Sequence, residues 1–350
     1  MQRQTARQDG TRAVDPLSDL LRAVRLRGAV YFLVDATPPW AAAAPPGREL
    51  APLLMPGAQH LIEYHVVRRG TCFGGLLGQK PVELGPGDVI VFPHGDAHVM
   101  SSSPNVRARG KDETEGLNEL LRKAAPPFAI RTGADGRATA EVVCGFLGCD
   151  VRPFNPLIAT LPRVLHVRAA EQNVHLNQLI ALTLAESAEP RAGGECTLTR
   201  LSELMFIEVV RRHLQSLPPG QEGWLAGLRD PAVGRALALL HGSPAHAWTL
   251  EGLARAACLS RSALAERFKQ FTGQAPMQYL AQWRMQLAAG LLADGNANVG
   301  AVAFEVGYGS EAAFSRAFKK LVGVPPSEWR ERGTPPSIQA ARASSLSSSA

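Results

Sequence analysis

A local sequence pattern occurs twice in the last third of this 350-residue chain, and it restricts the fold more than any other feature. The copies read TLEGLARAACLSRSALAERFKQFTG at 249–273 and NVGAVAFEVGYGSEAAFSRAFKKLVG at 298–323. In each copy, apolar residues at helical spacing predict a short helix, a tight turn, and a second helix followed by Gly. This is the sequence form of a helix-turn-helix, and two copies in tandem favour DNA recognition.

The first copy (249–271) predicts a helix capped by the side chain of Thr249 and a turn at 258–260. The second helix then runs over 261–271. Its apolar residues recur at i, i+4 and i+7, which gives the helix one buried and one free face. We expect the buried face to contain Leu264, Phe268 and Phe271.

The second copy (298–320) repeats this arrangement. Its turn lies at 307–309, and Ser310 is the expected N-cap of a helix that extends to Lys320. We expect the inward-facing residues of that helix to be Phe314, Phe318 and Leu321.

The segment between the copies, PMQYLAQWRMQLAAGLLA at 276–293, predicts one connecting helix, because Pro is favoured in the first helical turn. About 18 residues at a rise of about 1.5 Å span roughly 27 Å. A connector of this length could hold two recognition helices near the separation of successive major grooves, roughly 34 Å.

Between residues 28 and 103 the apolar pattern changes to that of short strands separated by Gly, Pro and Asp, which predicts a β-sandwich or barrel. The stretch GDVIVFPHGDAH at 87–98 fits the pattern G-x5-P-x-G-x2-H. Glu63 stands seven residues before Gly70, as in the pattern E-x6-G. The region therefore resembles a cupin, which is a small double-sheet jelly roll.

Residues 235–331 resemble the DNA-binding domain of the AraC/XylS family of bacterial transcription regulators. The resemblance rests on the two spaced copies, the connector RMQLAAGLL, the turn A-x-x-V-G-Y at 303–308, the run FSRAFKK and the terminal GVPPSEWR. The N-terminal half is similar to the cupin-type sensor domains of one branch of that family. The resemblance implies a regulator that reads promoter DNA under the control of a small molecule bound in the sensor.

The expected fold is α+β with two domains, a cupin-like β jelly roll with added helices and an all-helical tandem helix-turn-helix domain. Helices are expected over 172–187 and 197–217, and a flexible insertion over 105–137. The expected boundaries are a disordered N-terminus (1–14), a cupin-like domain (15–155), a helical region that the resemblance assigns to dimerisation (156–218), a linker (219–232), the DNA-binding domain (233–332) and a disordered tail (333–350).

Members of this family contact bases from the exposed N-terminal half of each recognition helix. Carried over by position, the resemblance assigns base contacts to Ser262, Ala265, Glu266, Glu311, Ala312, Ser315 and Arg316. Arg316 is the leading candidate for a bidentate contact to guanine. Four further cations are expected near phosphates, namely Arg261, Lys269, Arg284 and Lys319.

In the cupin-like region, Glu63, His65 and His98 are expected to line an effector pocket. Such side chains also bind metals, but the H-x-H pair that metal cupins carry before the glutamate is absent, since residues 55–60 read MPGAQH. We therefore expect no metal and no cofactor. Two alternatives remain, a cupin-fold metalloenzyme and a redox-sensing regulator that uses Cys72, although a cysteine is more often a small buried apolar residue.

The N-terminal stretch MQRQTARQDG lacks the apolar core of a secretory signal, and no run approaches the roughly 18 apolar residues of a membrane span. Five scattered cysteines favour a reducing cytoplasm. No nucleophile–base pair of known spacing stands out, which argues against an enzyme. We expect a cytoplasmic protein that binds double-stranded promoter DNA, a small-molecule effector, RNA polymerase and a second copy of itself, but no membrane.

Overall fold

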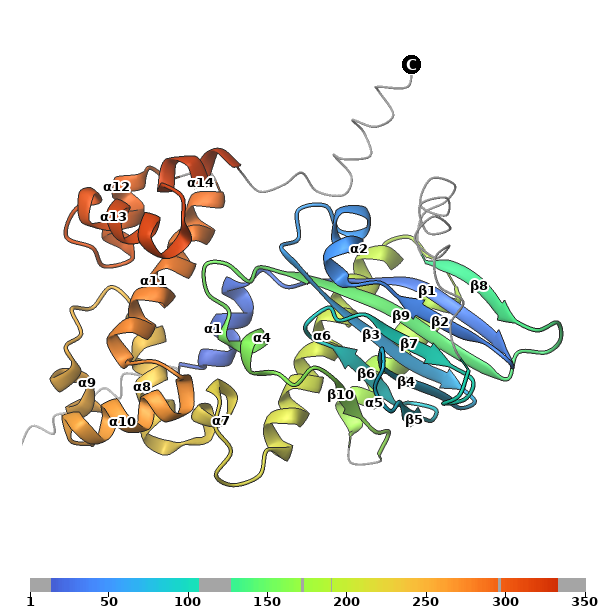
Figure 1. Ribbon diagram of the computed structural model, residues 1–350. Coiled ribbons are helices and arrows are strands. Elements are labelled where there is room, and N and C mark those ends of the chain that lie inside the picture. The colour runs from blue at the N-terminus through green and yellow to red at the C-terminus, as the bar shows by residue number, and fades with distance from the viewer. Residues whose placement is uncertain (1–13, 107–126, 171–172, 190, 295–296, 333–350) are drawn as a thin grey trace, which may run out of the picture. The chain divides into compact units, whose positions relative to one another are not determined.

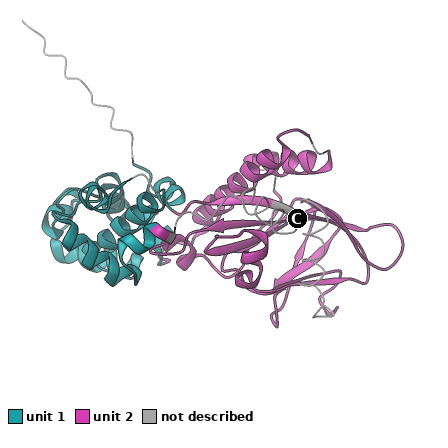
Figure 2. Ribbon diagram, turned by 90° about the horizontal axis from the view of Figure 1, so that it is seen from above, with its two compact units in different colours: residues 1–23, 222–330 teal, residues 24–221, 331–350 magenta. Residues whose placement is uncertain are grey.

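The computed structural model describes residues 14–106, 127–170, 173–189, 191–294 and 297–332. The expected disordered tail, most of the expected disordered N-terminus and most of the expected insertion lie outside these residues. The chain divides into two compact units (Figure 2), one formed by residues 24–221 and the other by residues 222–330 together with the segment that ends at Ala23. Within the described ranges, no helix has the length and apolar character needed to cross a membrane.

Residues 24–221 form a sandwich of two sheets (Figure 1). The larger sheet has the strand order β10-β6-β3-β9-β1-β8, and the smaller has the order β2-β7-β4-β5. The strands are β1 (Arg27–Thr37), β2 (Ala41–Ala44), β3 (His60–Arg69), β4 (Cys72–Leu76), β5 (Val82–Leu84), β6 (Val89–Phe92), β7 (His98–Ser101), β8 (Phe128–Gly133), β9 (Ala140–Cys149) and β10 (Leu165–Val167). The expected cupin-like double sheet is confirmed.

Nearly every residue of strand β3 is buried, because both of its faces are covered. Val67 belongs to the core between the sheets, together with Phe92 of the adjacent strand β6 and with Cys72 and Met100 of the smaller sheet. On the opposite face, the hydroxyl groups of Tyr64 and Ser202 lie 2.6 Å apart. Because successive side chains alternate across a strand, Glu63 and His65 share the inner face with Val67.

Two helices, α5 (Val174–Ala188) and α6 (Gly194–Ser216), pair with each other, and α6 packs on the outer face of the larger sheet (Figure 1). The approach is close at β1, where a Cβ added to Gly28 would lie 2.5 Å from the Cβ of Ser202. Two shorter helices, α2 (Gly47–Leu54) and α4 (Pro156–Thr160), complete the unit.

The structure differs from the expected boundaries in two places within this unit. The end of the expected insertion forms β8, which pairs in parallel with β1, Phe32 opposite Phe128. The expected helical region contains β10, which extends the sheet beside β6. Both strands are short and lie at sheet edges, so their sequences carry too little alternation to be recognised alone.

The second unit is entirely helical. Its helices are α1 (Pro16–Ala23), α7 (Trp224–Arg229), α8 (Pro231–Gly242), α9 (Leu250–Ala256), α10 (Arg261–Thr272), α11 (Pro276–Ala293), α12 (Val299–Glu305), α13 (Glu311–Val322) and α14 (Pro326–Arg332). The connecting helix predicted over 276–293 is confirmed as α11. The expected linker at 219–232 instead contains α7, whose Trp224 is buried and donates its indole N–H to the hydroxyl of Tyr279 (2.8 Å).

The cupin-like domain was expected to begin at residue 15, but α1 packs against α8 and α11 of the helical unit. Leu20 is fully buried there, and the side-chain amide of Gln286 donates to the carbonyl of Ala23 (2.9 Å). An amphipathic pattern shows that a helix has an apolar face, but it does not identify the surface that covers this face.

Candidate DNA-binding site and sensor cluster

Each helix-turn-helix is defined by side-chain caps at the start of both of its helices. In the first, the hydroxyl of Thr249 accepts a hydrogen bond from the backbone N–H of Gly252 (3.0 Å), and that of Ser260 accepts one from Ala263 (3.2 Å). Each cap satisfies an N–H group that has no partner within its helix. The predicted cap at Thr249 is confirmed.

The second helix-turn-helix is capped in the same way. Asn298 accepts from the N–H of Ala301 (2.6 Å), and Ser310 accepts from that of Ala313 (3.3 Å). The predicted cap at Ser310 is confirmed, and α13 begins at the next residue.

The two turns close with the same backbone hydrogen bond, from Leu259 to the carbonyl of Ala254 (3.0 Å) and from Tyr308 to that of Ala303 (2.8 Å). The preceding residue has a positive φ in both turns, 60° at Cys258 and 89° at Gly307. The second turn is one residue longer, since 306–310 separate its helices whereas 257–260 separate those of the first. The repeated sequence therefore produces a repeated backbone, with one inserted residue.

The buried faces of α10 and α13 follow the predicted spacing with two exceptions. Phe271, which was expected on the buried face of α10, is only half-buried. Leu264 and Phe268 are fully buried on α10, as are Phe314 and Phe318 on α13. Leu321, which was expected to pack inside, is 40% exposed, so that prediction was wrong. Val322 packs against the core in its place, because it stands four residues after Phe318.

The free faces carry most of the residues expected to contact DNA. The exposed ones are Arg261, Ser262, Glu266, Lys269, Glu311, Ala312, Arg316 and Lys319, whereas Ala265 and Ser315 are half-buried. Toward the described residues, the side chains of Arg261, Lys269, Arg316 and Lys319 form no hydrogen bond or ion pair. These cations therefore have their charges available to an external partner.

Not every cation of this unit is available in this way. Arg267 forms an ion pair with Asp230 (2.6 Å), which caps α8. Arg284, expected near phosphates, is half-buried and donates to three backbone carbonyls. Lys320 was missed among the candidates although it is exposed, and its position in the FKK run of α13 was the signal.

In the other unit, Glu63, His65 and His98 meet in the core between the sheets. The Nε2 atoms of the two histidines lie 2.7 Å apart, and Glu63 Oε2 lies 3.9 Å from Nε2 of His98. Phe92 stacks on the ring of His98 with a centroid distance of 3.7 Å. The predicted residues are thus brought together, but in a closed cluster that is at most 8% exposed.

Hydrogen bonding fixes the tautomers within this cluster. His98 Nδ1 lies 3.0 Å from the carbonyl of Asp96 and must donate to it, so His98 Nε2 accepts from His65. This leaves Nδ1 of His65 and Oε1 of Glu63 buried without a hydrogen-bond partner in the described part of the chain.

The cluster is uncharged at neutral pH. Burial raises the pKa of Glu63 to about 8 and lowers that of His98 to about 4. Among the described side chains, no group of three or more His, Cys, Asp or Glu residues is arranged to hold a metal ion. What the cluster offers chemically is two unsatisfied polar atoms in an apolar, neutral surrounding.

Cys72 does not have the properties of a reactive thiol. It is fully buried, and burial raises its pKa to about 12, so the thiolate that oxidants attack is scarce at neutral pH. A redox role would require the sandwich to open. Cys196 and Cys258 are exposed but were not among the candidates.

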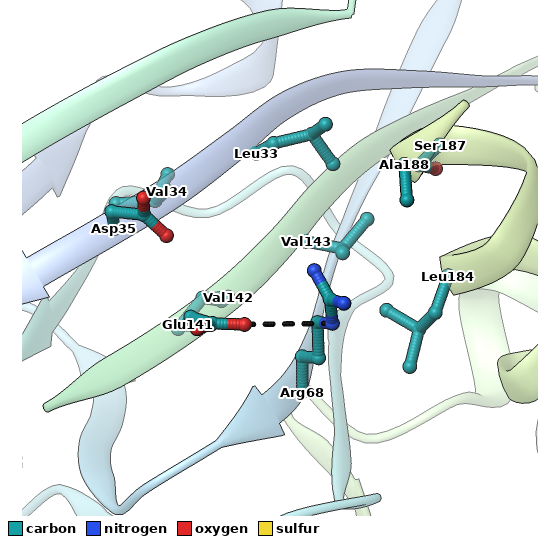
Figure 3. A pocket seen from close by; sticks show the side chains of 10 residues that line it. All are labelled: Leu33, Val34, Asp35, Arg68, Glu141, Val142, Val143, Leu184, Ser187 and Ala188. Carbon is teal, nitrogen blue, oxygen red and sulfur yellow. Dashed lines mark ion pairs between the residues drawn. The ribbon is translucent and has the colours of Figure 1, made fainter. Parts of the chain in front are cut away.

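A small hollow lies on the outer face of the larger sheet, against α5 (Figure 3). Leu33, Val143 and Leu184 form its apolar part, and the ion pair of Arg68 with Glu141 (3.4 Å) lies beside them. Its cavity volume of about 40 Å³ has room for a few water molecules, since one water needs about 10–15 Å³ by this measure.

Comparisons with known proteins agree with this architecture. The sequence model of a cupin family matches residues 15–215, and that of a helix-turn-helix domain family matches residues 253–332. A protein of Streptomyces lividans assigned as an AraC-like transcription regulator is 33% identical over 92% of this chain and 100% of its own length. The HTH-type transcriptional regulator AlkR of Acinetobacter baylyi is 27% identical over 91% of this chain and 100% of its own.

Among solved structures, the C-terminal domain of AraT, a response regulator from Geobacillus stearothermophilus, is 31% identical and covers 31% of this chain and 91% of that domain, with a TM-score of 0.30. The sequence relationship along nearly the whole chain, the cupin-like sandwich and the doubly capped helix-turn-helix pair lead to one assignment. The chain belongs to the AraC family of transcription regulators, with an N-terminal cupin domain and a C-terminal helix-turn-helix domain.

Proposed function

We propose that this regulator places α10 and α13 in successive major grooves of promoter DNA, and that a small molecule bound by the cupin-like unit controls this binding. The observation that carries the proposal is the matched pair of recognition helices. Both are capped by Ser, both expose cations that have no partner among the described residues, and one continuous helix of 18 residues, α11, separates them. An α-helix of this kind fits the major groove, which is about 12 Å wide.

The exposed side chains divide into two roles. Ser262, Glu266, Glu311 and Arg316 lie in the N-terminal halves of their helices, where base edges come within reach. Arg261, Lys269 and Lys319 are proposed to neutralise phosphates, and Lys320 joins them on the grounds of exposure and charge. These contacts would set affinity and salt dependence rather than the preferred sequence.

The effector is proposed to reach Glu63, His65 and His98. Two buried polar atoms without partners are costly, and a ligand that pairs with them would favour the conformation that admits it. Such a ligand should carry both a hydrogen-bond donor and an apolar body, because the cluster is neutral and Phe92 covers it. The alternative of a metalloenzyme would gain support only from stoichiometric metal in purified protein together with turnover.

A homodimer is proposed through α5 and α6. Three large apolar side chains on these helices, Val174, Leu182 and Leu204, are each about half exposed, and a second copy would cover them. We further propose that the protein works in the cytoplasm beside RNA polymerase, as a promoter-binding regulator requires.

The decisive experiment starts from a random-sequence duplex pool. The purified chain should enrich a pool sequence with two protected segments about one helical turn apart, and the enriched duplex should outcompete scrambled DNA by about a thousandfold or more. If no sequence is enriched and all duplexes bind with equal affinity, the proposal of sequence-specific DNA binding is wrong. Adding candidate metabolites and measuring both DNA affinity and thermal stability would then identify the effector.

A further inference from the structure

The guanidinium group of Arg284, in the middle of α11, contacts two segments that are far apart in sequence. Its Nε donates to the carbonyl of Pro244 (2.7 Å) and its Nη2 to that of His246 (2.9 Å). Its Nη1 donates to the carbonyl of Gly307 (3.2 Å). All three nitrogens of one side chain are thus engaged by backbone oxygens.

The two segments belong to different helix-turn-helix motifs. Residues 243–249 lead from α8 into α9, the first helix of the first motif, and Trp248 closes this loop by donating to the carbonyl of Ser243 (3.0 Å). Gly307 lies in the turn between α12 and α13 of the second motif. Arg284 therefore connects the entry of one motif to the turn of the other.

The two segments also touch directly. A Cβ added to Gly307 would lie 2.6 Å from the Cα of Ala245 and 2.7 Å from its carbonyl oxygen, so only glycine allows this approach. The Arg284 guanidinium carbon lies 5.7 Å from the centre of the Tyr308 ring, which adds a contact to the same turn. The backbones of the two segments are thus in contact at Ala245 and Gly307, and Arg284 donates hydrogen bonds to both segments beside this contact.

We infer that Arg284 is a positioning residue that fixes the two recognition helices relative to each other, and that it is not a phosphate contact. Hydrogen bonds from a charged donor are stronger than neutral ones, and the planar guanidinium holds its donors in a fixed geometry. A rigid connection raises the effective concentration of the second motif once the first is bound. The inference rests on the proposed reading of DNA by both motifs.

The matched variants are Arg284→Lys, which keeps the charge but cannot reach three carbonyls, Arg284→Ala, and Lys319→Ala as the phosphate-contact control. The probe is the duplex that wild-type protein enriches from a random pool. Affinity is measured against salt concentration, and again with two base pairs inserted between the protected segments.

Wild-type protein should lose most of its affinity on insertion. Both Arg284 variants should bind the intact duplex about tenfold more weakly, lose much less on insertion, and keep the wild-type salt slope, because rigidity rather than charge is lost. Lys319→Ala should lower the salt slope by about 0.9 and keep the spacing preference. If Arg284→Ala instead behaves as Lys319→Ala does, the inference is wrong.

A measurement without DNA separates this inference from the proposed function. Spin labels on Glu251→Cys and Lys320→Cys, with Cys196 and Cys258 replaced by Ser, report the distance between α9 and α13. Arg284→Lys should broaden the distance distribution while circular dichroism and the melting cooperativity stay as in the wild type. A distribution as narrow as that of the wild type would overturn the inference, even if DNA binding is demonstrated. Failure to enrich DNA together with a broadened distribution would overturn the proposed function alone.

Discussion

Arg316 and Lys319 lie three residues apart on α13, both exposed and both without a partner among the described residues, yet their effects on binding should differ. The planar guanidinium of Arg316 can donate two parallel hydrogen bonds to the edge of a guanine. The ammonium of Lys319 acts as a point charge and suits a phosphate, which is the same in every sequence.

Arg316→Ala is expected to reduce affinity for the enriched duplex by about 1–3 kcal/mol, while affinity for random DNA changes much less. Lys319→Ala should weaken binding to both duplexes by similar factors. Fluorescence anisotropy with labelled duplexes at several salt concentrations measures both effects. Equal losses on specific and random DNA for Arg316→Ala would place this residue at a phosphate instead.

His241 is a buried titratable group in the core of the helical unit. The hydroxyl of Tyr279 accepts from the indole N–H of Trp224, and it lies 2.8 Å from Nε2 of His241. Nδ1 of His241 is buried and has no hydrogen-bond partner within the described ranges, and burial lowers the pKa of His241 to about 3. The folded unit thus holds a neutral histidine.

This predicts acid sensitivity of the helical unit. Below pH 6.5 the unfolded chain binds a proton at residue 241 and the folded chain does not, so stability falls as the pH drops from 6.5 toward 3. The loss should reach about 2 kcal/mol by pH 5. Denaturant unfolding followed by tryptophan fluorescence measures it, since four of the five tryptophans (Trp224, Trp248, Trp283 and Trp329) lie in this unit. His241→Gln keeps an acceptor for Tyr279 without titrating, and an unchanged pH profile in this variant would assign the sensitivity elsewhere.

At the scale of elements, the turn between α9 and α10 and the turn between α12 and α13 close with the same backbone hydrogen bond but use different residues. Both need a positive φ after the first helix, and the second uses Gly307 whereas the first uses Cys258. A positive φ costs a residue with a Cβ about 1–2 kcal/mol of stability relative to glycine. This cost is partly offset, because glycine loses more conformational entropy on folding.

Cys258→Gly should therefore stabilise the helical unit by about 0.5–1 kcal/mol, measured as a higher denaturation midpoint. Gly307→Ala should destabilise it by more than about 2 kcal/mol, because the new Cβ meets the backbone of Ala245 in addition to the unfavourable φ. A loss of stability in Cys258→Gly would show that the thiol, which lies 3.8 Å from Arg235, contributes more than the backbone strain costs.

At the scale of the whole molecule, α1 is the element whose partner could not be inferred from its own sequence. Its apolar residues face α8 and α11, and Leu20 is fully buried at that contact. Leu20→Ala is expected to cost about 2–5 kcal/mol of the helical unit's stability, as for other buried leucines. Arg22→Ala, on the exposed side of the same helix, should change stability by less than about 0.5 kcal/mol. If the two variants unfold alike, α1 does not belong to this unit in solution.

The sequence predicted the helix-turn-helix pair nearly residue by residue, since caps, turns and apolar spacing act within a few neighbours. Helix α11 and the caps Thr249 and Ser310 are of this kind. Strands β8 and β10 and the location of α1 depend on surfaces far along the chain, which no local pattern encodes. The same holds for Arg284, because its carbonyl partners lie 23 to 40 residues away and carry no side-chain signature.

The location of α1 also determines how the domains of such a protein can be exchanged with those of a related regulator. The helical unit is not a single continuous piece of polypeptide, because the backbone leaves it after Ala23, builds the sandwich and returns near residue 222. Exchanging the complete DNA-binding unit between two regulators with this arrangement would require two crossovers in the gene, one after α1 and one near residue 222. A single crossover near residue 222 would transfer the DNA-binding unit without its own α1, so the apolar surface of α8 and α11 would be exposed. The recipient would keep its own α1, whose apolar face fits the DNA-binding unit that was replaced.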